Sequence, residues 1–149
     1  MKSYEDEKNV DLLPILPEEM YGDLRIAIMH PRVKGYFLVA KIFRANKGIS
    51  LARLIATRAC KLVRAIKDQE IFHENQSGRG MYFLCEGVFD LICADHTKYS
   101  IGPEKEEPYL PPDGFVVNWV SEFALQMEWL HKDRLVACRS GEVLLYVCS

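Results

Sequence analysis

The sequence predicts an α+β fold in which helices precede an antiparallel β-roll. Up to about Arg58, apolar residues recur at the spacing of amphipathic helices. From about Cys60 onward they form short runs that are rich in aromatic and β-branched residues, and turn residues separate the runs. Helices followed by a series of antiparallel strands are typical of this fold class.

Composition limits the kinds of protein that this chain can be. Its 149 residues are 49% hydrophobic and 27% charged, enough to bury one core, and we expect one domain with an appendage. The net charge of -2 gives no electrostatic basis for a nucleic-acid partner. The five cysteines include no Cys-x-x-Cys pair, which favours reduced thiols in a cytoplasmic protein over disulfides or zinc. The sequence has no signal-peptide pattern and no apolar run near the ~18 residues of a membrane span.

Three helices are expected before the strands. The first begins at Pro17 and ends near Met29, with acidic residues in its first turn, where the helix dipole favours them. A second is expected from Val33 to Phe43, and a third from Leu51 to about Arg58 with Ser50 as its N-cap. The predicted division is a flexible arm at residues 1–12, helices at residues 13–58 and a β-roll at residues 59–149.

The strands are expected to follow one another through tight turns. Short antiparallel strands are predicted at residues 60–66 and 70–72, and a β-hairpin at residues 81–92, with Gly87 supplying positive φ at its turn. A second hairpin turn at residues 95–97 leads to a strand at residues 99–101. Residues 102–114 are rich in charge and proline and are expected to form a surface loop. The last strand is expected at residues 142–149.

Two motifs resemble a known family. The spacing Gly78-x-x-Met-Tyr-Phe-Leu-x-x-Gly-x-x-Asp90 resembles the second and third strands of the cyclic nucleotide-binding domain, a β-roll of regulated ion channels and other proteins. The segment Leu16-Pro-x-x-Met-x-x-Asp-Leu24 is similar to the end of the linker that joins the channel pore to that domain. The resemblance implies a β-roll interrupted by a short phosphate-cassette helix, with the family's closing C-terminal helices absent from this sequence.

The same resemblance implies a ligand site. The family's cassette starts with Gly-Glu-x-Ala-Leu, its Glu binds the ribose hydroxyl, and an Arg about ten residues later pairs with the cyclic phosphate. Here Ser121 replaces the Gly and can cap the helix. The Arg position falls at His131 or Lys132, with Arg134 two residues beyond. The implied cyclic-nucleotide site comprises Ser121, Glu122, Phe123, Ala124, Lys132 and Arg134.

The resemblance therefore implies a regulatory domain, similar to the cytosolic gating module of a potassium or cation channel. Its expected ligand is cAMP or cGMP, bound weakly or not at all, and its expected partners are other subunits or the pore region of a channel-like parent. The expected location is the cytoplasm or the cytosolic side of a membrane. The alternative is an assembly module with the same fold and no ligand. The histidines have no metal-ligand spacing and no nucleophile lies beside a base, so neither a metal site nor an enzyme is expected.

Overall fold

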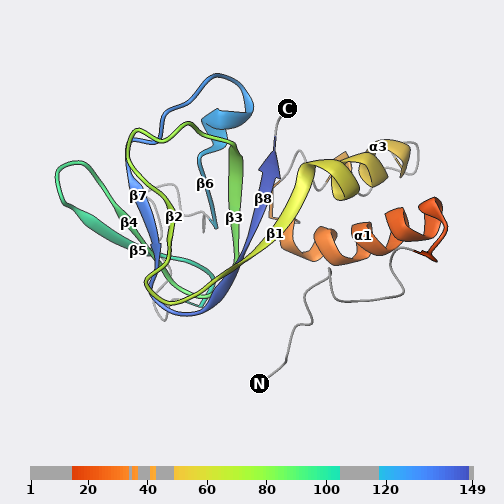
Figure 1. Ribbon diagram of the computed structural model, residues 1–149, viewed down its shortest axis with the longest axis horizontal. Coiled ribbons are helices and arrows are strands. Elements are labelled where there is room, and N and C mark those ends of the chain that lie inside the picture. Colours follow the sequence, from red (N-terminus) through yellow and green to blue (C-terminus); the bar gives the residue numbers. More distant parts are fainter. Residues whose placement is uncertain (1–14, 34, 37–40, 43–48, 105–117, 148–149) are drawn as a thin grey trace. The chain divides into compact units, whose positions relative to one another are not determined.

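The computed structural model describes residues 15–33, 35–36, 41–42, 49–104 and 118–147 (Figure 1). The chain divides into two compact units, Met1–Thr57 and Arg58–Ser149, and each is described by itself.

The first unit contains helical segments. Helix α1 spans Glu18–Val33, and helix α3 spans Ile49–Leu54 and continues as the π-helix η4, Ile55–Ala59. The buried Arg25 on α1 donates a hydrogen bond from Nε to the Ala56 carbonyl oxygen at 3.0 Å. Arg53 on α3 pairs with Asp23 on α1 at 2.9 Å. These two polar links join α1 to the α3–η4 segment.

Several predicted helix boundaries are wrong. Helix α1 continues past Met29 to Val33 and includes the proline at position 31 in its last turn. A turn at residues 35–36 follows, so no helix starts at Val33, and most of the second predicted helix lies outside the described residues. Helix α3 begins at Ile49, which places Ser50 inside the helix instead of at its N-cap.

The second unit is an antiparallel β-roll of two four-stranded sheets (Figure 1). The first sheet has the order β1-β8-β3-β6 and the second has the order β2-β7-β4-β5, and all their pairings are antiparallel. The strands are β1 (Cys60–Ala65), β2 (Glu70–Phe72), β3 (Gly80–Glu86), β4 (Phe89–Ile92), β5 (Lys98–Ile101), β6 (Trp119–Val120), β7 (Arg134–Ala137) and β8 (Gly141–Val147). Strands β4 and β5 form the predicted second hairpin.

The predicted hairpin at residues 81–92 is wrong in its pairing. Both strands exist, but β3 pairs with β8 and β6, whereas β4 pairs with β7 and β5. Gly87, at φ 101°, and a register shift between Leu84 and Glu86 turn the chain from one sheet into the other. Strands β1 and β2 are likewise in different sheets. Turn residues set where a strand ends, but partners distant in sequence decide its pairing.

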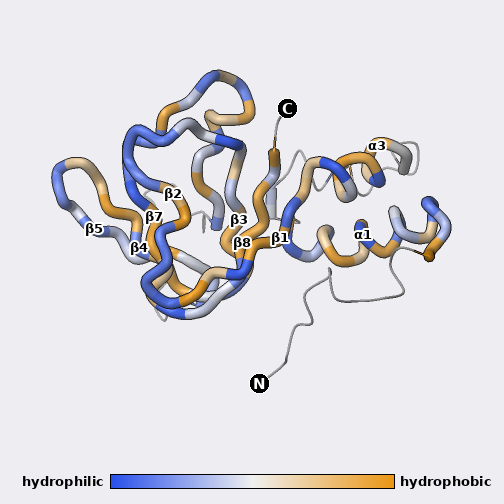
Figure 2. The backbone as a smooth tube through the Cα atoms, viewed as in Figure 1, coloured by the Kyte–Doolittle hydropathy of each residue, from blue (hydrophilic) through white to orange (hydrophobic). Residues whose placement is uncertain are grey.

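The core of the roll lies between the two sheets. Inward residues of β3 and β8, such as Tyr82 and Val143, meet residues of the other sheet, such as Phe89 and Leu135. Leu144, on the opposite face of β8, is also fully buried. Figure 2 shows that β8 is hydrophobic along much of its length. Burial on both faces is typical of a central strand.

Gly80 permits the close approach of β3 and β8. A Cβ at this position would overlap the Tyr146 carbonyl oxygen and would lie 2.8 Å from the Tyr146 carbonyl carbon. The absence of a side chain is therefore a packing requirement at the point where Gly80 pairs with Val147.

Candidate functional site

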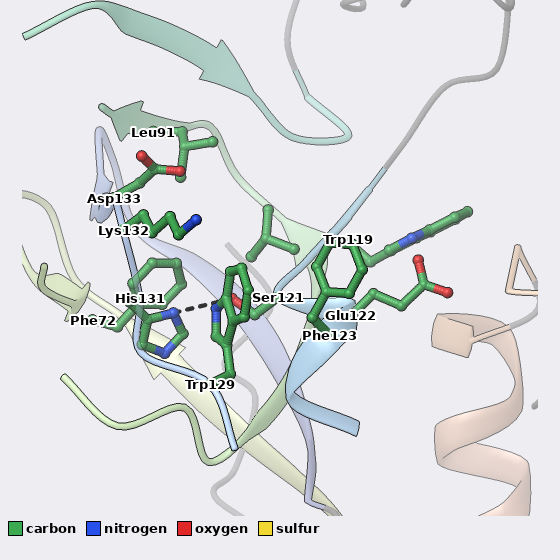
Figure 3. A pocket seen from close by; sticks show the side chains of 11 residues that line it. Phe72, Leu91, Trp119, Ser121, Glu122, Phe123, Trp129, His131, Lys132 and Asp133 are labelled. Atoms are coloured by element: carbon green, nitrogen blue, oxygen red, sulfur yellow. Dashed lines mark hydrogen bonds between the residues drawn. The ribbon is translucent and has the colours of Figure 1, made fainter. Parts of the chain in front are cut away.

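A cavity of about 430 Å³ lies within the roll (Figure 3). Its lining comes from β2, β4, β6, η5 and the segment before β7, where η5 is the 3-10 helix Glu122–Leu125. The lining residues are Phe72, Leu91, Trp119, Val120, Ser121, Glu122, Phe123, Trp129, His131, Lys132 and Asp133. An apolar cavity with a few polar groups is the usual form of a small-molecule site.

Ser121 links β6 to η5 at the wall of the cavity. Val120 pairs with Tyr82 of β3, which fixes the position of the next residue. Ser121 has φ 65° and ψ 34°, a left-handed conformation that is common for glycine and costly for other residues. Its side chain does not cap η5, so the predicted cap is wrong. Instead its Oγ lies 3.2 Å from His131 Nδ1.

His131 is held on several sides. Its ring, which is 2% exposed, stacks on the Phe72 ring with centroids 3.8 Å apart and planes 10° apart. Its backbone NH donates to the Gln76 carbonyl at 2.9 Å, and its own carbonyl accepts from the Asn75 NH at 2.7 Å. The backbone of His131 therefore joins the loop after β2, while its ring joins Phe72 of β2 to Ser121, the residue that precedes η5.

The charge of His131 is controlled by its surroundings. Burial lowers the pKa of its imidazole, the nearby His73 lowers the pKa further, and Asp133 opposes the shift. Its Nε2 atom is buried without a hydrogen-bond partner, so a proton on both ring nitrogens would leave an unpaired interior charge. The ring therefore contributes a neutral surface to the cavity near pH 7.

Trp129 lies between an aromatic ring and a cation. Its ring centroid is 5.2 Å from that of Phe123, with the planes tilted by 31°. The Lys132 Nζ atom lies 5.6 Å from the Trp129 ring centroid, within the range of a cation–π interaction. Lys132 and Asp133 lie on one side of the cavity, and Glu122 and Phe123 on the other (Figure 3).

The structure brings four of the six residues in the implied site to the cavity: Ser121, Glu122, Phe123 and Lys132. Ala124 is not in the lining, and a Cβ added at Gly78 would lie 3.1 Å from the Ala124 Cβ. Arg134 is also outside the lining, because its Nε pairs with Glu70 Oε2 at 3.0 Å across β7 and β2. Among the described residues that line the cavity, Lys132 is thus the only lysine or arginine.

Two other features are absent from the described part of the chain. No group of three or more His, Cys, Asp or Glu side chains is arranged there to hold a metal ion. None of the helices described there has the length and apolar character needed to cross a membrane.

The sequence matches no protein-family model and no curated protein. Solved structures similar in fold include a cyclic nucleotide-binding-like protein from Brucella abortus bv. 1 str. 9-941, with TM-score 0.53, 19% identity and coverage of 78% of this chain and 90% of that one. Another is PKAR CBD2 with Sp-2Cl-cAMPS bound, with TM-score 0.57, 12% identity and coverage of 85% and 73%. The chain has the fold of a cyclic nucleotide-binding β-roll.

The fold also occurs in a regulator of transcription. The sensor domain of the transcriptional regulator DNR from Pseudomonas aeruginosa has TM-score 0.51 and 11% identity, and the match covers 66% of this chain and 63% of that domain. None of these three proteins is named as an ion channel. The comparisons show the fold of the roll alone, because identities of 11–19% carry no information about function or about individual site residues.

Sequence reasoning left several lining residues out of the implied site. Trp119 and Trp129 were not assigned to it, and Phe72 had only a strand assignment. His131 was considered only as an alternative to Lys132 for the position of the family's arginine. For Trp119 the sequence offered one local signal, which is its position two residues before Ser121, a residue of the implied site. No local signal identifies the stack of Phe72 on His131, because these rings are far apart in sequence.

Proposed function

We propose that this chain is a cyclic-nucleotide-binding-like regulatory domain, similar to the cytosolic gating module of an ion channel, in which cyclic nucleotides bind weakly. The cavity carries this proposal. Ser121 and Glu122 lie in its lining together with Lys132, although about ten residues separate them in sequence. Occupancy of such a site would shift a two-state arrangement of the helices that precede the roll.

The expected weakness has a chemical reason. A cyclic phosphate is gripped best by a guanidinium, which donates two parallel hydrogen bonds, and Arg134 is instead paired with Glu70. Lys132 can neutralise a phosphate but offers only a point charge. Loss of one charge-assisted bond, about 1.5–3 kcal/mol, corresponds to a roughly 10- to 150-fold weaker complex.

An assembly module with the same fold is the second candidate. Large apolar side chains are exposed in and after η5, with exposed fractions of 56% for Phe123, 56% for Met127 and 58% for Leu130. Exposed apolar groups close together are typical of surfaces that another protein covers. In this alternative the roll would contact other subunits or the pore region of a channel-like parent.

Calorimetric titration with cAMP and with cGMP separates the two candidates. The regulatory proposal requires saturable heat from at least one of these ligands, with a dissociation constant in the high micromolar to millimolar range. It also requires that Lys132→Ala weaken the complex, since this residue is the cation that faces the cavity. Absence of heat at millimolar ligand would leave the assembly candidate.

A further inference from the structure

The cavity presents one charge of each sign to a ligand. Lys132 and Asp133 line the same side of it (Figure 3). Burial, the charge of Asp133 and a hydrogen bond to Asp133 raise the pKa of the Cys93 thiol, so the Asp133 side chain lies against the residue that follows β4. The carboxylate of Glu122 points away from Lys132 and Asp133, and Glu122 has an interaction of its own. For a phosphate that approaches Lys132, the charges of Lys132 and Asp133 therefore offset each other.

The cations near the cavity are also engaged by the protein itself. The Nζ atom of Lys132 lies 5.6 Å from the centroid of the Trp129 ring, and a phosphate that binds this ammonium must replace the cation–π contact. Arg134 is paired with Glu70 at 3.0 Å. His131 remains neutral near pH 7, because its ring is buried and its Nε2 atom has no partner. Within the described lining, a phosphate therefore meets no guanidinium and no imidazolium.

The rest of the wall suits an uncharged ring. Apolar surface comes from Phe72, Leu91, Val120, Phe123 and Trp129. The volume of about 430 Å³ falls within the range of roughly 300–1,000 Å³ in which small-molecule sites bury most of their ligand. Burial of a flat ring against such side chains gives affinity because apolar surface leaves water, and this contribution does not depend on a phosphate.

We infer that this cavity takes an uncharged nucleoside at least as readily as the corresponding cyclic nucleotide. The apolar wall would bury the base, and the cyclic phosphate would add almost nothing, because Lys132 attracts it and Asp133 repels it to a similar extent. This inference rests on the proposed function, since it requires that the cavity bind the nucleoside part of a cyclic nucleotide. The signal that the domain detects would then include uncharged nucleosides.

Calorimetric titration with adenosine and with cAMP, which share base and ribose, tests this inference. We expect the adenosine complex to be no more than about threefold weaker than the cAMP complex, and we expect adenosine to displace cAMP in a competition titration. If cAMP binds more than threefold more tightly, or if adenosine binds without competition, the inference is overturned while the proposed function stands. If adenosine alone binds at millimolar concentration, the inference is supported and the cyclic-nucleotide function fails. If neither binds, both fail.

Two charge variants test the physical reason. Asp133→Asn removes the repelling charge without a change of size, and it should raise the ratio of cAMP affinity to adenosine affinity roughly fivefold, because unit charges about 8 Å apart at an effective dielectric of about 40 shift affinity by about that factor. Lys132→Met removes the attracting charge and should lower the ratio by a similar factor; since Lys132 is exposed, this variant serves if Asp133→Asn does not fold. Glu74→Gln is the matched control, because Glu74 is exposed in the loop after β2 and does not line the cavity. Equal ratios in the wild type, the control and the folded charge variants would overturn the inference.

Discussion

Replacement of Gly80 by alanine should destabilise the roll strongly, because it forces β3 and β8 apart. The added methyl would overlap the Tyr146 carbonyl oxygen and would lie 3.0 Å from the Val147 Cα. These are backbone atoms of a strand that β1 holds on its other side, so β8 cannot retreat without loss of the β1–β8 ladder. Overpacking costs about 1–3 kcal/mol, and we expect the upper end here because no side chain can rotate away.

Urea denaturation of Gly80→Ala and Gly78→Ala measures this cost. A methyl on Gly78 would lie 3.1 Å from the Ala124 Cβ and the Trp129 Cδ1 and 3.2 Å from the Trp129 carbonyl oxygen, and contacts of this length need a shift of only a few tenths of an ångström. Both replacements reduce the entropy of the unfolded chain by the same amount, so that effect cancels in the comparison. Gly80→Ala should be less stable than Gly78→Ala by about 2 kcal/mol. Equal stability of the two variants would refute the account of the β3–β8 approach.

Three further measurements probe the site and its surroundings. The free energy of unfolding should fall as the pH drops below about 6.5, because burial lowers the pKa of His131 in the folded protein while the unfolded chain takes up a proton at the ordinary value. His131→Phe should flatten this dependence, and an unchanged slope would count against it. Alkylation of Cys138 near pH 8 should be roughly a hundredfold slower in the folded than in the unfolded chain, because burial and the neighbouring Asp90 raise the pKa of its thiol to about 11. Peptide mass spectrometry measures both rates, and equal rates would contradict this prediction. Arg134→Ala should cost less than about 1 kcal/mol in urea and should leave the cAMP titration unchanged, since this exposed pair with Glu70 is outside the cavity; a weaker cAMP complex would contradict that placement.

The positions of most strands were predictable, but apart from the β4–β5 hairpin their partners were not. Runs of aromatic and β-branched residues identified strands β3, β4 and β8 because these side chains suit a pleated, buried surface. The turn at Gly87 has the same residues whether it closes a hairpin or carries the chain to the other sheet. What decides the outcome is the pairing of β3 with β6 and β8, and these strands are provided by segments far along the chain.

The site was predictable where it is continuous in sequence. Ser121 and Glu122 belong to one short motif, and the structure places both at the cavity. The position of Arg134 depends on the alternation of side chains along strand β7 and not on its spacing from Glu122 in the motif. Leu135 and Ala137 are buried in the core, and because successive strand residues point to opposite faces, Arg134 points away from the core and meets Glu70.

Ser121 offers a test of the backbone conformation that the cassette requires. Its left-handed φ of 65° costs a residue with a side chain roughly 1–2 kcal/mol, and its hydroxyl bond to His131 returns about 0.5–1.5 kcal/mol. Ser121→Ala keeps the strain and loses the bond, so it should be less stable than wild type by about 1 kcal/mol. Ser121→Gly loses the bond and the strain together, so its stability should match that of wild type within about 0.5 kcal/mol. Glycine normally destabilises a folded chain relative to alanine, so in urea denaturation a more stable Ala variant would show that residue 121 does not adopt this conformation.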